Sequence, residues 1–243
     1  MHKPLTNRMG IPALWLMKTE PKIFWDFCQA LLGDERLGLL NTREFKLAEY
    51  ALQLPPGSLT SDDVPLPADF LRLRLAMPDE AIAPDFFYYD AYMFASRCLM
   101  EALAQPKDVV QFVPVELASG SPQARAQEYH LMRVLPRQPA MDLARSECSV
   151  DEFTSPLTGQ LVRMAMHISK FVLLDTLQPR TEIFRVDEAP SRILASDGIA
   201  QRVLLAGCTG MEFADPANRW SGMRVERYRT VNGIAERRVG FLD

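Results

Sequence analysis

The sequence predicts an α+β fold, in one domain with a largely antiparallel sheet, a duplicated helix-strand unit and a C-terminal β-hairpin. Two observations predict it. Residues 92–116 and 193–215 follow the same order of strand end, Ala-Ser helix start, helix, loop and strand. Asn232-Gly233, a pair that type I′ turns prefer, stands between two strand-like segments. With 243 residues, 48% of them hydrophobic, the chain can bury a sizeable core.

The first 60 residues are expected to form a strand and a helix. An apolar run from Ile11 to Met17 predicts the strand. Thr19 can then cap a helix that has Pro21 in its first turn, where the missing N–H of proline removes no hydrogen bond. Apolar residues follow at helical spacing, and Gly33 ends the helix.

A turn-rich connection follows this region. Residues 41–54 fit a helix or a strand equally well, whereas residues 55–69 are rich in Pro, Gly, Ser and Asp, as surface connections are. We therefore divide the chain into an N-terminal region, 1–60, and an α+β body, 61–243, that contains both repeats. We expect the N-terminal region to pack on the body as part of one structural unit.

An acidic segment with aromatic residues at its centre comes next. From Asp62 to Asp90, seven acids stand against Arg72 and Arg74, a local charge of −5. Acids in such a run usually form a solvated face, and we expect the aromatic residues beside them to lie in the core. The alternative is a surface for a basic protein partner. The residues predicted to bind that partner are Asp79, Glu80, Asp85, Tyr88, Tyr89 and Asp90.

The two repeated segments are predicted to be structurally equivalent. In the first, Ser96 caps a helix that Pro106 ends, and Val109 to Val115 forms a buried strand. In the second, Ser196 caps a helix that Gly207 ends, and a short strand follows. The alignment places Ala95-Ser96 on Ala195-Ser196, and Val110, Gln111 and Phe112 on Met211, Glu212 and Phe213.

Between the repeats we expect a polar loop from Ser119 to Arg125 and three strands. Apolar and β-branched runs predict the strands at Tyr129 to Leu135, at Ile168 to Leu174 and at Glu182 to Val186. After the second repeat, the hairpin segment from Arg219 to Val239 holds six arginines and two glutamates, a local charge of +4. This charge suits an acidic partner or a phosphate, but it also suits a solvated sheet edge that resists edge-to-edge pairing.

Composition and charge limit the cellular compartment and the classes of binding partner that we expect. The net charge of −4 and the pI near 5.5 argue against nucleic acid, because phosphate contacts need a dense positive surface. The apolar run from Met9 to Met17 lacks a signal-peptide cleavage site, and no run reaches the roughly 18 apolar residues of a membrane span. We therefore expect a cytoplasmic protein that binds neither nucleic acid nor membrane.

No constellation of reactive residues is evident. His130 and His167 each stand alone in an apolar run, where a histidine is more often structural than catalytic. The four cysteines form no CxxC pair, and the GxSxG, HExxH, Walker A and GxGxxG motifs are missing. Gly207 to Gly210 has GxxG spacing without basic neighbours, so we interpret it as a helix stop and a turn. We predict no catalytic, cofactor-binding or metal-binding residue.

Several short motifs occur in a recognisable order between Asp69 and Asp215. They are a serine that starts a helix, an x-F-x-P-V strand, a D-L-x-x-S turn and a later F-R strand. Their residues here are Ser96; Phe112, Pro114 and Val115; Asp142, Leu143 and Ser146; and Phe184 and Arg185. This order resembles a bacterial immunity-protein family of polymorphic-toxin systems, long catalogued as a domain of unknown function.

The resemblance implies a non-catalytic protein that neutralises a cognate toxin by binding it, as a monomer or a homodimer and without a cofactor. Two other interpretations stay open. One is a small-molecule enzyme with a cleft between the two repeats, using Glu116, His130 or His167. The other is a homo-oligomeric structural protein.

Overall fold

The computed structural model describes residues 14–20, 38–39, 65–66, 73–77, 84–89, 92–154, 159, 161–217, 222–229 and 235–242. The N-terminal helix predicted after Thr19, the ambiguous segment 41–54 and most of the connection at 55–69 lie outside these residues. Of the predicted partner-binding residues, Asp79, Glu80 and Asp90 also lie outside them.

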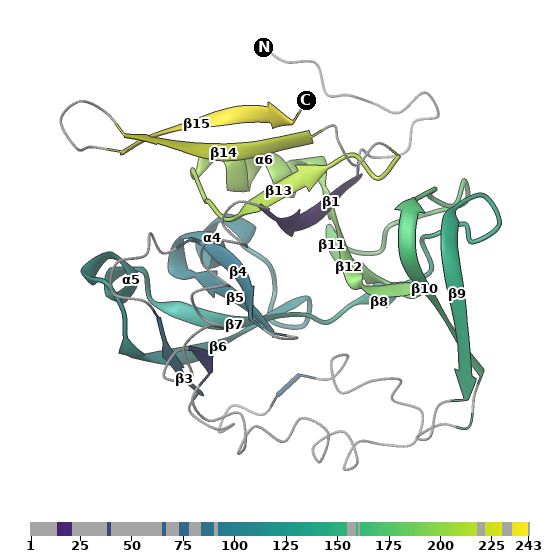
Figure 1. The fold of residues 1–243 in the computed structure, drawn as a ribbon, viewed down its shortest axis with the longest axis horizontal. Helices are drawn as coiled ribbons and strands as arrows, with labels where there is room; N and C mark the ends of the chain where they lie inside the picture. The colour runs from purple at the N-terminus through teal and green to yellow at the C-terminus, as the bar shows by residue number, and fades with distance from the viewer. Residues whose placement is uncertain are drawn as a thin grey trace.

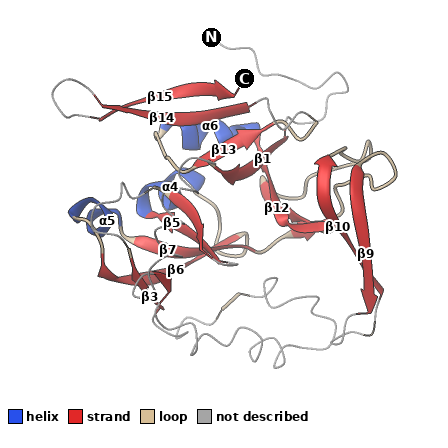
Figure 2. Ribbon diagram, in the orientation of Figure 1, coloured by secondary structure: helices blue, strands red, loops and turns tan. Residues whose placement is uncertain are grey.

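Two larger sheets and one two-stranded ribbon form an α+β fold with three short helices in this part of the chain (Figures 1 and 2). The six-stranded sheet has the order β2-β3-β6-β7-β5-β4, and only its β3–β6 pair is parallel. The strands are β2 (Gly38–Leu39), β3 (Leu73–Ala76), β4 (Phe86–Tyr89), β5 (Tyr92–Ser96), β6 (Val110–Ser119) and β7 (Tyr129–Val134).

The seven-stranded sheet has the order β15-β14-β13-β1-β12-β11-β8, and only its β11–β8 pair is parallel. Its strands are β1 (Leu14–Thr19), β8 (Arg137–Gln138), β11 (Ile183–Val186), β12 (Ala189–Ser196), β13 (Met211–Ala214), β14 (Gly222–Arg229) and β15 (Ala235–Leu242). The ribbon pairs β9 (Glu147–Thr154) with β10 (Leu161–Lys170). The helices are α4 (Arg97–Leu103), α5 (Pro122–Gln127) and α6 (Asp197–Leu205).

The predicted duplication is confirmed, and it includes four strands in each copy. In one unit the strand order is β6-β7-β5-β4, with α4 between β5 and β6. In the other it is β13-β1-β12-β11, with α6 between β12 and β13. The registers agree as well: Phe112 lies opposite Met132, and Phe213 lies opposite Met17, as the sequence alignment of the repeats requires. The third strand differs in origin, because β7 follows β6 directly whereas β1 comes from the N-terminal region.

Both helices begin in the same way. The Ser96 hydroxyl accepts a hydrogen bond from Leu99 N at 3.2 Å, and the Ser196 hydroxyl accepts one from Ile199 N at 3.2 Å. Each serine also donates its hydroxyl to an acid just before the preceding hairpin, Asp85 in the first unit and Glu182 in the second. This acid therefore also belongs to the repeated unit, although it precedes the two segments in which the sequence revealed the repeat.

The two units pack against each other through one hydrophobic core. Equivalent positions line it: Phe86 and Ile183, Ala95 and Ala195, Leu99 and Ile199, Leu103 and Val203, and Val110 and Met211. Arg202 of α6 donates to the carbonyls of Ala102 and Leu103, at the end of α4, both at 3.4 Å. Buried side chains of the described residues thus pack between the repeats, at the place where the enzyme interpretation put a cleft.

Other predicted elements need correction at their boundaries. The first strand continues beyond the predicted Met17 to Thr19, which pairs with Met211, and the helix that Thr19 was predicted to cap lies outside the described residues. The strand β6 extends to Ser119 and is only half-buried beyond Val110, with Pro114 exposed. The prediction of a polar loop from Ser119 to Arg125 is wrong in part, because Ser121 caps the short helix α5.

The strand predicted at Ile168 to Leu174 lies earlier in the chain. Strand β10 ends at Lys170, and Phe171 and Leu177 then pack into a separate core as non-strand residues. The predicted strands at β7 and β11 and the C-terminal hairpin of β14 and β15 are confirmed. The turn of that hairpin, with Asn232-Gly233, lies outside the described residues.

Candidate partner-binding surface

Asp85, one of the six residues predicted to bind a partner, is buried at 1% exposure. Its carboxylate accepts hydrogen bonds from the Ser96 hydroxyl at 2.7 Å, from Thr209 N at 2.8 Å and from the Thr209 hydroxyl at 2.9 Å. A carboxylate that leaves water must be compensated in this way. Asp85 therefore joins the two repeated units inside the protein and does not lie on a surface open to a partner.

The aromatic residues beside Asp85 belong largely to the core. Phe86 and Phe87 are fully buried, whereas Tyr88 and Tyr89 are half-buried. The Tyr88 ring packs edge-on against Phe86, with ring centroids 5.4 Å apart. Burial raises the pKa of Tyr88 to about 12, and the positive charges of Arg192 and Arg185 oppose this shift. Partner binding through Tyr88 and Tyr89 stays a prediction.

The three residues of the enzyme interpretation do not form one site. Glu116 and His130 lie on neighbouring strands, where His130 pairs with Pro114, but His167 lies on β10 in the ribbon. His130 is half-buried, and burial lowers its pKa although the carbonyl and charge of Glu128 oppose the shift. His167 is exposed and has a φ of 47° at the irregularity of β10.

The D-L-x-x-S motif forms the predicted turn. Asp142 Oδ1 accepts from Ala144 N at 3.0 Å and from Arg145 N at 3.1 Å, and Ser146 Oγ accepts from Val172 N at 3.0 Å. Hydrogen bonds from the side chain and the backbone of Arg145 lower the pKa of Asp142. These contacts include a link between the segment just before β9 and the segment just after β10, so the residues of the motif support the fold.

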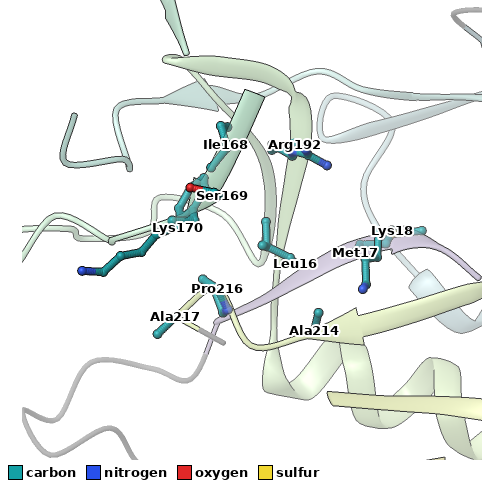
Figure 3. A pocket seen from close by; sticks show the side chains of 11 residues that line it. Leu16, Met17, Lys18, Ile168, Ser169, Lys170, Arg192, Ala214, Pro216 and Ala217 are labelled. Atoms are coloured by element: carbon teal, nitrogen blue, oxygen red, sulfur yellow. The ribbon is translucent and has the colours of Figure 1, made fainter. Parts of the chain in front are cut away.

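A groove lies beside β10, where the ribbon meets the seven-stranded sheet (Figure 3). It has two adjoining cavities of about 320 and 500 Å³ that share Ile168, Ser169 and Arg192. Leu16 and Ala214 give the smaller cavity an apolar lining, and Lys18, Lys170 and Arg192 contribute positive charge. Lys18 is paired with Glu212 at 3.1 Å. These positive charges suit an acidic segment, and the larger cavity is also lined by Met166 and by His167 of the enzyme interpretation.

The ribbon of β9 and β10 carries most of the large apolar side chains exposed in the described structure. They are Val150 at 41%, Phe153 at 45%, Leu161 at 61% and Met166 at 38% exposure, and the fifth, Leu205 at 83%, lies on α6. The ribbon projects from the body as a sheet of its own (Figures 1 and 2). Exposed apolar side chains gathered on one element are characteristic of interaction surfaces.

Pairing across the ribbon determines which side chains share a face. Phe153 lies opposite Val162, Asp151 opposite Met164, and Ser149 opposite Met166, so these six residues form one face. The other face includes Cys148 and Ala165, which pack against the core beneath the ribbon, and also the exposed Val150 and Leu161. We call the first set, Ser149, Asp151, Phe153, Val162, Met164 and Met166, the outward face.

Sequence reasoning did not find this surface. The alternation of Val162, Met164 and Met166 with Arg163 and His167 is the signal that was available, since it predicts a strand with one apolar face. Nothing local indicates that this face stays uncovered, because that depends on where the ribbon leaves the body.

No helix in the described part of the chain is long and apolar enough to cross a membrane. The same residues contain no group of three or more His, Cys, Asp or Glu side chains placed to hold a metal ion.

A family model, the Immunity protein family (Imm11), matches residues 39–218. The comparison with curated proteins gave no match. The matched span contains both helices of the repeat and the ribbon, whereas β1, β14 and β15 lie outside it.

Proposed function

Because the chain belongs to the Immunity protein family (Imm11), we propose that it neutralises a cognate bacterial toxin by binding it directly, without catalysis. The observation that carries the proposal is the family match, which spans residues 39–218 and so covers most of the chain. The proposal places the protein in the cytoplasm, where it would meet the toxin before the toxin reaches its target. It does not require a cofactor, and its partner is a protein.

The roles of the motif residues support binding over catalysis. Ser96 caps a helix, Asp142 and Ser146 form a turn, and Phe184 is a buried core residue. Phe112 packs partly against the core between the repeats. Residues that identify the family in this sequence therefore build the scaffold, as expected of a protein that acts through its surface.

Co-expression with the toxin tests the proposal. The probe is the C-terminal module of the toxin encoded beside this gene, expressed in a sensitive bacterium with and without this chain. We expect growth only when both proteins are present, and a 1:1 complex with a Kd in the nanomolar range or tighter. Failure of the chain to protect against that module, or to bind it, would contradict the proposal.

Stoichiometry separates binding from enzymatic neutralisation. In a titration of the purified toxin module, a binding protein removes toxin activity in proportion to the amount of protein added. All activity is lost near one molar equivalent. An enzyme that modifies the toxin instead inactivates an excess of it over time. Complete inactivation at a hundredth of an equivalent would therefore contradict neutralisation by binding.

A further inference from the structure

We propose that the toxin docks on the outward face of the β9–β10 ribbon through an apolar surface that carries an arginine or lysine opposite Asp151. This inference rests on the proposed function and names the part of the surface that performs it. It also replaces the acidic and aromatic segment around Asp85 as the first surface to test.

The placement of the ribbon is the first argument. Among the described residues its two strands pair only with each other, and the seven-stranded sheet holds it through contacts such as Ala165 N to the Glu188 carbonyl at 2.6 Å. An isolated two-stranded ribbon has marginal stability in water, so it must gain from packing on at least one face. Cys148 and Ala165 provide that packing on the inner face.

The outward face is the second argument, because it is apolar and uncovered. Phe153 and Met166 are 45% and 38% exposed, and the half-buried Val162 and Met164 lie between them. Phenylalanine and methionine are enriched where proteins bind one another, and methionine adapts its shape to the surface that it meets. Since the core of the chain gains little from these residues, a partner is what would bury them.

The charges of the ribbon identify the chemistry of that partner. Glu152 is paired with Arg163 at 2.7 Å and Glu147 with Lys170 at 3.9 Å. Asp151, opposite Met164 on the outward face, makes no ion pair within the described residues. A carboxylate in an apolar patch needs a cation once the interface excludes water, and arginine meets a carboxylate with two hydrogen bonds. The complementary toxin surface is therefore apolar with a basic residue near its centre.

The groove beside β10 is the competing location. Lys18 is paired with Glu212 and Lys170 with Glu147, whereas Arg192 would select an acidic segment, the opposite of what Asp151 selects. Met166 of the outward face also lines the larger cavity, so the residues that separate the two locations are Arg192, in the groove on β12, and Asp151, on β9.

The test measures the Kd of ribbon variants for the purified toxin module by calorimetry. We expect the double variant F153S/M166S to weaken binding roughly 100-fold and D151K roughly 10-fold or more, because both remove contacts at the centre of the interface. The matched control is L205S, which removes an even more exposed apolar side chain from α6 and should leave the Kd unchanged. A thermal melt of each variant checks the fold, and little change is expected because the altered side chains are exposed.

The outcomes distinguish the inference from the function on which it rests. If the wild-type chain does not bind the module, the proposed function fails. If it binds and F153S/M166S binds equally well, the ribbon is not the docking surface. Weakening by R192E alone would place the toxin in the groove and overturn the proposal. Loss of self-association in F153S/M166S, with toxin binding intact, would assign the outward face to a second copy of this chain.

Discussion

Asp85 and Thr209, separated by 124 positions in the chain, exchange hydrogen bonds in both directions. The Asp85 carboxylate accepts from the backbone N and the hydroxyl of Thr209, at 2.8 and 2.9 Å. In return, the Thr209 carbonyl accepts from Asp85 N at 3.0 Å and from Phe86 N at 3.1 Å. One residue pair therefore joins the hairpin of the first unit to the turn that follows the helix of the second.

Replacing Asp85 should destabilise the whole fold. The variant D85A leaves the Ser96 hydroxyl and both donors of Thr209 without their buried acceptor, and we expect a loss of roughly 3 kcal/mol in the free energy of unfolding. Urea denaturation measures it. The control E101A removes an acid that is largely exposed on α4 and should change stability by less than about 0.5 kcal/mol. Equal urea midpoints for the two variants would show that the buried network contributes little.

The turn at Gly210 should tolerate no side chain. Its φ is +92°, and a Cβ there would lie 2.2 Å from the carbonyl oxygen of Phe86. We expect G210A to lose about 4 kcal/mol or more, or to be insoluble, because two fixed backbone segments would have to separate. The comparison is G159A, at a φ of +68° with nothing within 4 Å, where only the conformational cost of about 1 kcal/mol remains. Similar losses in the two variants would contradict the steric explanation.

Tyr88 should make stability depend on pH in the alkaline range. Burial raises its pKa from 10.0 to about 12, so the folded protein keeps the phenolic proton after the unfolded chain has lost it. Its contribution is intact below pH 10 and is lost as the pH rises toward 12, by roughly 1 kcal/mol per pH unit. Urea denaturation from pH 8 to 11 should show a steeper decline for the wild type than for Y88F. Identical pH profiles, or a difference spectrum between wild type and Y88F in which the Tyr88 phenolate appears near pH 10, would refute this.

Local signals determined which elements could be predicted from the sequence. Ser96, Ser196 and Gly207 act at the ends of helices, where the capping residue and the helix lie within a few positions of one another. Ser121 and Pro122 give the same signal at α5, but the polar composition around them favoured a loop. The error at Ile168 to Leu174 has another cause, since apolar residues such as Phe171 reach a core without belonging to a strand.

The candidate site depended on long-range contacts, so the sequence predicted less of it. Seven acids between Asp62 and Asp90 suggested an exposed negative surface, but a count of charges does not reveal that Ser96 and Thr209 converge on Asp85. The outward face of the ribbon was missed for the opposite reason, because the sequence suggests burial where the fold leaves side chains exposed. Its alternating apolar residues resemble those of any strand that packs on a core, and only the fold shows that they are left uncovered.

The different origin of β1 and β7 has a consequence for how the chain acquires its structure. All strands of the first unit lie within residues 86–134, so that unit needs only short loop closures and can assemble while the later part is still being synthesised. The second unit must bring β1, near residue 14, between β12 and β13, about 180 to 200 positions later. Its closure is therefore the slow, high-contact-order step of folding, and until then the chain exposes the unpaired edges of both strands.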